Sequence, residues 1–373
     1  MSNNNKKLLV TYFFPPSIGG VENYYLNLLS YFDQSEISVL CQQQAGDKEF
    51  DLTRPYHIYR TEFFGGKLPP RWLKLQPEIK EIMATEKAGS LIFGHFHPLN
   101  IIGSRLKVPY YVFGHGTDIR KIRNNFWQKF IFKKVYRDCQ AIVTNSNYLA
   151  QEIEKLTGSK EKVQIVYPGV NWQQLNQPAA DFEAKRDSLG IGADDLVILS
   201  MGRLIKDKNY EAIIRIMPAL LNLLPRIKYI IVGDGPELAN LKALAEQADL
   251  ENKVIFTGRV ENNDSAKAFY YQLAHVYVGV SAVPEGLGVS YLEAQACRTP
   301  VVASKDGGSA EAVLDGKTGI LADPKDQDEI AKAIYRLLSD KELWDKMAAA
   351  GQERVKQEFD WKLEAEKIKE ILK

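Results

Sequence analysis

Short runs of β-branched and aromatic residues alternate with longer helical patterns along the whole chain. The runs span residues 7–13, 37–41, 90–94, 110–113, 141–145 and 163–166 in the first half, and 197–201, 229–232, 254–257, 276–280 and 301–303 in the second. Strands that alternate with helices are typical of parallel sheets joined by right-handed crossovers. One open sheet with this many strands would be unusually wide. The pattern therefore predicts an α/β protein built from two doubly wound domains in series.

A polar stretch over residues 171–192 separates the two halves, and it contains Pro178 but no strand-like run. We therefore expect a first domain over 1–172 and a second domain over 187–357. The last segment, 358–373, has the pattern of an amphipathic helix, and we expect it to cross back to the first domain. Ligands of open α/β sheets bind at the carboxyl ends of the strands. Two such domains facing each other would place a site in the cleft between them.

The composition is ordinary for a water-soluble protein, because 45% of the 373 residues are apolar and 25% are charged. This argues against a disordered, collagenous or coiled-coil chain. The three cysteines, Cys41, Cys139 and Cys297, are too few and too scattered for a disulfide framework or a zinc site. We find no secretory segment, because the apolar run from Leu8 soon meets Pro15, and no apolar stretch of about 18 residues that could span a membrane. We expect a cytoplasmic protein.

Charge is distributed unevenly along the chain. Residues 1–180 hold 22 Lys+Arg and 15 Asp+Glu, a net charge of +7, so the remainder of this +1 chain carries −6. In the basic half, the segment Arg120–Arg137 interleaves lysines and arginines with apolar residues. Such a helix can lie on an anionic membrane surface, or it can pack on the core with its basic face in solvent. Nucleic acid is a poorer partner, because there is no recognition motif and the other half is acidic.

Glycines and cations follow several of the strand-like runs. Gly19 and Gly20 follow the first run, and Gly233 follows the run that ends at Val232; glycine lets the backbone approach a ligand closely. Arg203 and Lys208 follow the first run of the second half. A guanidinium fork and an ammonium group at such a place suit a diphosphate. Each motif alone also fits a plain turn or a solvated basic loop.

The stretch Pro284–Ala296 is the most informative one. Gly286 and Gly288 suit a loop whose amides point at a ligand, and a helix starting near Gly288 would aim its positive end at the same place. Glu285 and Glu293 lie eight residues apart. Eight helical residues rise roughly 12 Å, more than the roughly 5 to 9.5 Å of a glycosidase carboxylate pair. The two glutamates therefore suit two ends of a long ligand.

Two short patterns resemble metal sites, but the sequence favours simpler explanations. His95 and His97 lie at a strand end with no further Cys/His cluster to complete a site. Asp326 and Asp328 form a D-x-D pattern, but they follow Pro324 and open a helical pattern, so helix capping explains them better. We therefore expect no metal cofactor, with the basic pair and helix N-terminal amides stabilising the charge instead.

Taken together, these motifs resemble those of glycosyltransferase family 4, a large retaining family with the GT-B fold. The spacing from Glu285 to Glu293 matches its E-x(7)-E signature, and Arg203 and Lys208 match its diphosphate-binding basic pair. Further landmarks, in the expected order, are Gly19-Gly20, His115-Gly116-Thr117-Asp118, Asn145-Ser146, Pro168-Gly169-Val170 and Val232–Glu237.

The resemblance covers nearly the whole chain. The stretch Glu285–Cys297 is most similar to the bacterial phosphatidylinositol mannoside mannosyltransferases, which use GDP-mannose. The sequence departs from the family at Pro168, where many members have Asn, and at Leu287, where Phe is common. The implied fold is GT-B, with two Rossmann-like domains facing across a cleft.

The resemblance also implies a role for each matching residue. Glu285 would hydrogen-bond the hydroxyls of the donor sugar, and Glu293 would hold the ribose hydroxyls. Arg203 and Lys208 would neutralise the leaving diphosphate, while His115 would lie near the reacting face of the sugar. The remaining donor-binding positions, many of them acting through the backbone, are Gly19, Gly20, Gly233, Arg259, Val260, Gly286, Leu287, Gly288 and Val289.

The sequence is thus interpreted as a metal-independent, retaining hexosyltransferase. It would move mannose from GDP-mannose to a hydroxyl of a lipid-linked or glycan acceptor at the inner membrane face. The first alternative keeps the reaction and changes the donor to a UDP-sugar such as UDP-glucose or UDP-GlcNAc. A sugar-nucleotide epimerase is a second alternative. A non-enzymatic sugar binder is a third, but it would not need the basic pair together with both glutamates.

Overall fold

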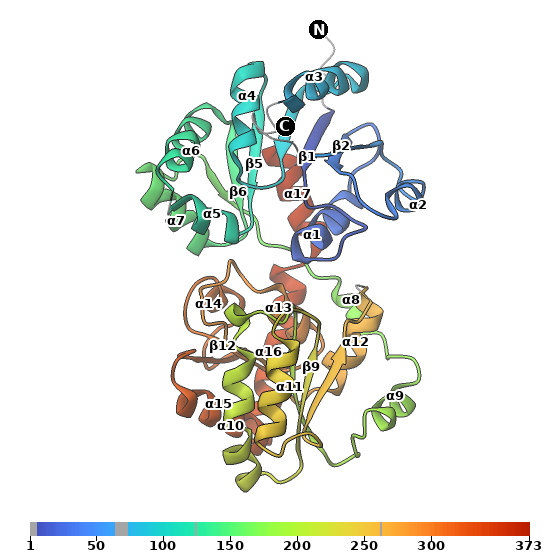
Figure 1. Cartoon of the computed structure of the whole chain (residues 1–373), viewed down its shortest axis with the longest axis vertical. Helices are drawn as coiled ribbons and strands as arrows, with labels where there is room; N and C mark the ends of the chain where they lie inside the picture. The colour runs from blue at the N-terminus through green and yellow to red at the C-terminus, as the bar shows by residue number, and fades with distance from the viewer. Residues whose placement is uncertain (1–5, 64–73, 124, 262) are drawn as a thin grey trace. The chain divides into compact units, whose positions relative to one another are not determined.

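The computed structural model describes residues 6–63, 74–123, 125–261 and 263–373. Its contacts divide the chain into two compact units (Figure 1). Unit 1 comprises residues 1–168 together with 361–373, and unit 2 comprises 169–360.

Unit 1 is built on a seven-stranded parallel sheet in the order β3-β2-β1-β4-β5-β6-β7. Its strands are β1 Lys7–Thr11, β2 Ile37–Gln42, β3 Ile58–Thr61, β4 Ser90–Phe93, β5 Tyr110–Gly114, β6 Ala141–Thr144 and β7 Val163–Ile165. Its helices are α1 Gly20–Leu29, α2 Asp47–Asp51, α3 Leu75–Glu86, α4 Ile101–Leu106, α5 Thr117–Arg123, α6 Phe126–Asp138, α7 Asn147–Thr157 and α17 Trp361–Ile371, with a 3₁₀ turn η2 at Pro98–Asn100.

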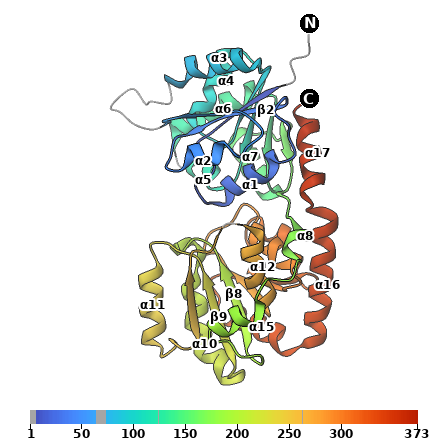
Figure 2. The same ribbon diagram turned by 90° about the vertical axis from the view of Figure 1, so that its right-hand side faces the viewer.

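Both faces of this sheet are covered, which explains why its strands read as continuous apolar runs. Alternate residues of β1 enter different cores: Leu8 and Val10 pack with α3, α4, α6 and α7, whereas Leu9 packs with α1 and α17. Helix α17 belongs to the second of these cores, where the Trp361 ring lies 5.4 Å from that of Tyr24. Both ribbon views show α17 against the rest of unit 1 (Figure 1, Figure 2).

Unit 2 is built on a six-stranded parallel sheet in the order β10-β9-β8-β11-β12-β13. Its strands are β8 Leu196–Met201, β9 Ile227–Val232, β10 Val254–Gly258, β11 Val276–Gly279, β12 Val301–Ser304 and β13 Gly319–Ala322. Its helices are α8 Trp172–Leu175, α9 Phe182–Ser188, α10 Tyr210–Leu223, α11 Leu238–Gln247, α12 Asp264–Leu273, α13 Val289–Ala296, α14 Ser309–Ala312, α15 Gln327–Ser339 and α16 Lys341–Glu358, with a 3₁₀ turn η3 at Lys206–Lys208. Figure 2 shows α11 and α16 on opposite sides of this sheet.

The prediction of two parallel, doubly wound, Rossmann-like domains is confirmed. In each unit the chain starts in the middle of the sheet, runs to one edge and then returns to build the other half. This order creates a topological switch point beside the first strand, where ligands of such folds bind. The switch points are at the carboxyl ends of β1 and β4 in unit 1, and of β8 and β11 in unit 2.

The boundaries of the two units differ from the predicted ones at both places where the chain passes from one unit to the other. The first part of unit 1 ends at residue 168 rather than 172, and unit 2 begins at Gly169 rather than 187, because the Val170 amide donates to the Phe359 carbonyl oxygen at 2.7 Å. The polar stretch predicted as a linker instead forms α8 and α9 of unit 2. The final helix begins at Trp361 rather than at 358, because Phe359 is buried and Asp360 pairs with Val170.

The predicted basic helix over 120–137 is also different in the structure. It is divided into α5 and α6, because the Asn125 side chain accepts a hydrogen bond from the Gln128 amide at 3.1 Å and starts a new helix there. Phe132 and Val135 of α6 are buried in the core of unit 1. Among the described residues, no helix is both long and apolar enough to cross a bilayer.

Candidate functional site

The carboxyl ends of β8 and β9 in unit 2 are packed closely against each other. The Leu204 amide donates to the Asp234 carbonyl oxygen at 3.0 Å. A Cβ atom on Gly233 would lie 1.9 Å from the Gly202 oxygen, and one on Gly235 would lie 2.4 Å from the Leu204 oxygen. Backbone packing therefore explains why these positions are glycine, and the contact of Gly233 with a nucleotide stays a prediction.

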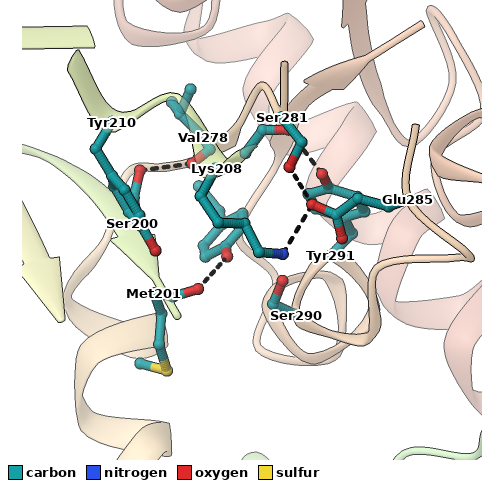
Figure 3. A pocket seen from close by; sticks show the side chains of 11 residues that line it. Ser200, Met201, Lys208, Tyr210, Val278, Ser281, Glu285, Ser290 and Tyr291 are labelled. Carbon is teal, nitrogen blue, oxygen red and sulfur yellow. Dashed lines mark hydrogen bonds and ion pairs between the residues drawn. The ribbon is translucent and has the colours of Figure 1, made fainter. Parts of the chain in front are cut away.

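Lys208 and Glu285 come together at the switch point of unit 2, as Figure 3 shows. The Lys208 Nζ donates to Glu285 Oε1 at 2.9 Å, and the Ser281 hydroxyl donates to the same oxygen. Both side chains of the ion pair are partly enclosed, with 34% of Lys208 and 17% of Glu285 exposed. Two residues that the sequence analysis selected separately therefore form one charged centre.

Local hydrogen bonds hold the Lys208 turn against the loop after β11. The Ala282 amide donates to the Asp207 carbonyl oxygen at 2.8 Å, and the Asn209 side chain donates to the Val280 oxygen at 3.1 Å. Asn209 has a φ of 56°, a left-handed conformation that asparagine tolerates better than most residues. The turn thus places Lys208 on the same side as Glu285.

Three buried tyrosines line the same pocket as this ion pair, and Figure 3 labels two of them, Tyr210 and Tyr291. The Tyr291 hydroxyl donates to the Gly279 oxygen at 2.7 Å, and the Tyr277 hydroxyl donates to the Met201 oxygen at 3.1 Å. Burial, with the nearby Glu285 carboxylate adding to it, raises the pKa of Tyr210, Tyr277 and Tyr291. The phenols therefore stay neutral and brace the ends of β8 and β11.

The loop before α13 is held by backbone contacts. The Gly308 amide donates to the Glu285 carbonyl oxygen at 2.9 Å, which ties the loop to the segment after β12. Gly288, with a φ of 88°, precedes the first residue of α13 without a side-chain cap. Leu287 is buried, so only its backbone can reach a ligand. The uncapped amides at this helix start are suited to an anion.

Three further predicted residues of unit 2 lie outside the ion pair: Arg203, Arg259 and Val260. Arg203 is exposed, and in the described part of the chain its guanidinium has no hydrogen-bond or ion-pair partner. Arg259 is exposed and Val260 is partly buried; both follow β10 and precede α12. The guanidinium of Arg203 is therefore available to a ligand, and the contacts assigned to Arg259 and Val260 stay predictions.

Glu293 has its own set of partners, separate from those of Glu285. Its Oε1 accepts a hydrogen bond from the Lys267 ammonium group, and its Oε2 accepts one from the Tyr271 hydroxyl at 2.6 Å. Lys267 also lies 3.3 Å from Asp264 Oδ1. The two glutamates therefore belong to different polar clusters, and their contacts with opposite ends of a long ligand stay a prediction.

In unit 1, α1 starts at the switch point with a glycine pair. Gly19 precedes the helix in an extended conformation, and no side chain caps the helix start. A Cβ atom on Gly20 would meet nothing within 4 Å, so packing does not explain this glycine. A Cβ atom on Gly19 would instead lie 2.3 Å from Glu22 Oε2. Open space beside the start of this helix is compatible with the diphosphate contact predicted for Gly20.

His115 lies at the end of β5, and its tautomer follows from counting protons. The Tyr25 hydroxyl donates its proton to the Gly94 carbonyl oxygen at 2.7 Å and lies 2.9 Å from His115 Nε2. The ring nitrogen must therefore be the donor in the second contact, which leaves Nδ1 with the lone pair. Burial lowers the pKa of His115, although the nearby Asp118 carboxylate opposes this shift. His115 is thus a neutral imidazole at pH 7.

The patterns that resembled metal sites have structural roles. His97 Nδ1 accepts a hydrogen bond from the Leu99 amide at 3.1 Å and caps η2. Asp326 accepts one from the Glu329 amide at 3.0 Å and caps α15, as predicted. No group of three or more Cys, His, Asp or Glu side chains that could hold a metal ion occurs among the described residues.

Sequence reasoning missed three polar residues that contact the predicted glutamates. Ser281 lies just beyond the carboxyl end of β11, four residues before Glu285. Lys267 and Tyr271 are four residues apart on α12, a spacing that puts both on one helix face. That spacing, directly after the predicted base-contact segment, is the signal that could have found them.

The comparisons with known proteins agree with this architecture. The family model for glycosyl transferases group 1 matches residues 181–354, and the model for Glycosyltransferase Family 4 matches residues 18–174. Among solved structures, the HepE protein of Anabaena in complex with UDP-glucose has a TM-score of 0.82 at 22% identity, covering 98% of this chain and 99% of that chain. A glycosyltransferase from Rickettsia africae has a TM-score of 0.80 at 21% identity, covering 99% and 98%.

The fold and the matching family models therefore define a glycosyltransferase of the GT-B type. The chain belongs to glycosyltransferase family 4, as its two family models together show. Among its curated relatives, the GDP-mannose-dependent alpha-(1-6)-phosphatidylinositol monomannoside mannosyltransferase of Mycolicibacterium smegmatis is 27% identical over 98% of this chain and 97% of the relative. The monoacylated-substrate counterpart of Corynebacterium glutamicum is 28% identical over 100% and 99%.

Proposed function

We propose that this glycosyltransferase moves mannose from GDP-mannose to a hydroxyl of a lipid-linked or glycan acceptor, with retention and without a metal ion. The observation that carries the proposal is the Lys208–Glu285 ion pair at the switch point of unit 2. It sets a cation for a diphosphate directly beside a carboxylate for sugar hydroxyls. The choice of mannose is supported by the two GDP-mannose-dependent relatives that match nearly the whole chain.

The proposed site acts mainly by electrostatic stabilisation of the leaving group. When the bond between the sugar and the diphosphate breaks, the leaving diphosphate gains negative charge, and nearby cations and helix amides stabilise it. Lys208, Arg203, which has no partner among the described residues, and the uncapped start of α13 would supply that stabilisation. Glu285 would accept hydrogen bonds from sugar hydroxyls and hold the reacting carbon in place.

Three residues of unit 1 keep the roles that the family resemblance gives them. Gly19 and Gly20 would let the start of α1 approach the diphosphate. His115 would accept a hydrogen bond from a sugar hydroxyl at Nδ1, the nitrogen that carries the lone pair.

A thermal-shift titration with nucleotide sugars tests the donor. At a ligand concentration of about 100 times Kd, binding adds about 2.7 kcal/mol to the stability of the folded state. We expect GDP and GDP-mannose to raise Tm by several degrees, and UDP, UDP-glucose and UDP-GlcNAc to raise it by much less. A larger Tm shift with UDP and UDP-sugars than with GDP and GDP-mannose would identify a UDP-sugar as the donor. No Tm shift with any nucleotide would contradict the proposed function.

Product analysis separates transfer from the epimerase alternative. A transferase consumes GDP-mannose only when an acceptor hydroxyl is present, apart from slow hydrolysis. Proton NMR of the product should show that the anomeric configuration of the donor is kept. Conversion of the nucleotide sugar to an epimer without acceptor would contradict transfer, and an inverted product would contradict retention.

We also propose that the protein works at the cytoplasmic face of an anionic membrane, with α6 as the contact. Phe126, Trp127 and Phe130 of α6 are 77%, 71% and 62% exposed. Lys133 on this helix is exposed and Lys129 is partly exposed, whereas Lys134 is paired with Asp138. Exposed aromatics beside lysines are typical of helices that lie in a lipid interface.

Vesicle co-sedimentation tests this contact. Each Lys near an anionic surface contributes about 1 kcal/mol, which is screened by salt. The protein should sediment with phosphatidylglycerol vesicles and dissociate from them as the salt concentration rises. It should not sediment with phosphatidylcholine vesicles. Changing Lys129, Lys133 and Lys134 together to Glu should abolish sedimentation without lowering donor affinity.

The aromatic residues are tested separately. Replacing Trp127 and Phe130 with Ser should weaken sedimentation about as much as the charge reversal does. Leu52→Ser, at a residue of unit 1 that is 88% exposed, is the matched control and should have no effect. Failure of the wild type to bind anionic vesicles at low salt would make a soluble acceptor the better interpretation.

A further inference from the structure

One face of α12 carries three polar side chains in unit 2. Asp264, Lys267 and Tyr271 are spaced i, i+3 and i+7, so they lie on the same side of the helix. All three are largely enclosed: the side chains of Asp264 and Lys267 are 15% and 12% exposed, and Tyr271 is fully buried. Polar groups are rarely enclosed in this way unless they have fixed partners.

The partner of this face is the carboxylate of Glu293 on α13. Lys267 donates to Oε1 and Tyr271 donates to Oε2. Behind Lys267, Asp264 Oδ2 accepts a hydrogen bond from the Asn171 side chain at 2.8 Å. Burial lowers the pKa of Lys267, but the carboxylates of Glu293 and Asp264 more than reverse this effect, so the group stays an ammonium ion.

Counting lone pairs shows what the carboxylate can still bind. A carboxylate offers about four acceptor positions, two on each oxygen. Lys267 and Tyr271 occupy one position on each oxygen, and no other donor reaches the Glu293 carboxylate in the part of the chain that the structure describes. One position therefore remains on each oxygen. Two neighbouring hydroxyls, each donating one proton, match that arrangement.

The family resemblance assigns the ribose hydroxyls to Glu293; we infer that Lys267 and Tyr271 are positioning residues that orient this carboxylate, so that each of its oxygens accepts one of the vicinal 2′- and 3′-hydroxyls. This inference rests on the proposed function, because it takes the ligand to be a nucleotide sugar. Tyr271 holds one oxygen of the Glu293 carboxylate by a hydrogen bond, and Lys267 holds the other. The positive charge of Lys267 also offsets the repulsion between the carboxylates of Asp264 and Glu293. The site should therefore discriminate strongly between ribose and a sugar without these hydroxyls.

The test compares the Kd of GDP with that of 2′,3′-dideoxy-GDP by calorimetry, with UDP and its dideoxy analogue measured in parallel. We expect the wild type to prefer the ribonucleotide by at least about tenfold, because two hydrogen bonds to a charged acceptor are lost. Lys267→Met should reduce this preference to about threefold or less. Tyr271→Phe should reduce it partially. Affinity for the dideoxy nucleotide should change little in either variant.

Lys242→Met is the matched control, since Lys242 on α11 is exposed and contacts only the Phe256 ring in the described structure. It should keep the full preference. Tm is measured for every variant to show that it folds. If Lys267→Met does not fold, Tyr271→Phe alone tests the inference. Unchanged preference in a folded Lys267→Met or Tyr271→Phe variant, or an equal loss of affinity for both nucleotides, would overturn the inference alone. Failure of the wild type to bind any of the four nucleotides would overturn the proposed function and the inference with it.

Discussion

Replacing Glu285 with Gln should lower kcat by about 100-fold and leave the Kd for GDP within about threefold of the wild-type value. The amide cannot accept the charge-assisted hydrogen bonds of the carboxylate, which contribute about 1.5–3 kcal/mol each. Because those bonds are made to the reacting sugar, their loss appears in turnover and not in nucleotide binding. Steady-state kinetics and calorimetry on the same preparation measure both quantities.

The matched control for this variant is Glu211→Gln. Glu211 is also a glutamate in an ion pair of unit 2, with Arg215 at 2.6 Å, but it lies on the exposed part of α10. Its replacement should change neither kcat nor Kd measurably. A Glu285→Gln enzyme with near-normal turnover would remove Glu285 from the active site.

Arg203→Ala and Lys208→Ala should each lower kcat/KM by about 10- to 100-fold, which corresponds to about 1.4–2.7 kcal/mol. Both side chains are proposed to neutralise the leaving diphosphate, so their loss raises the energy of the transition state. The effect of Lys208→Ala should be the larger, because it also leaves Glu285 without its cation. Affinity for GDP should fall more than affinity for GMP in both variants.

Lys206→Ala is the control, since Lys206 is an exposed lysine of the same turn. It should keep full activity. Treatment of the wild type with EDTA should also leave the rate unchanged, because protein cations are proposed to do the charge stabilisation. Loss of activity in EDTA that magnesium or manganese restores would count against this scheme.

The sequence predicted strands best where both faces of the sheet are covered. β1, with Leu8, Leu9 and Val10 all buried, produces an unbroken apolar run that is easily recognised. β3 at one sheet edge was not predicted, because its four residues are only partly buried and include Arg60, which pairs with Asp51 at 2.6 Å. β13 at the other edge begins with a glycine and is equally short.

Boundaries were harder to predict because they depend on contacts distant in sequence. The polarity around residue 171 does suggest a linker, but the hydrogen bond from Val170 to Phe359 joins residues almost 190 positions apart. No local pattern contains that pairing. The segment 120–137 illustrates the same limit, since its apolar residues divide between the core, as Phe132 does, and solvent, as Trp127 does.

In the site, residue types were predictable and their partners were not. A glutamate between proline and glycine, and a basic pair at a strand end, are unusual enough to be selected from the sequence. Ser281 and Tyr271 are common residues in ordinary contexts, and only the packing of the loops and of α12 brings them to the two glutamates. Hydrogen-bond partners in a folded site are set by tertiary structure, which composition and periodicity do not contain.

Unit 1 cannot complete its core until helix α17, at the end of the chain, has been synthesised. A ribosome makes residues 1–168 first, yet Trp361, Ala365 and Ile368, which fill one face of this unit's core, emerge only after all of unit 2. At about 5–20 residues per second, the delay is on the order of 10–40 s. During that interval Leu9 and Tyr24 line an apolar surface without its cover, the kind of surface that chaperones bind. An isolated first unit would therefore need residues 361–373 fused back to it by a linker to become a stable protein.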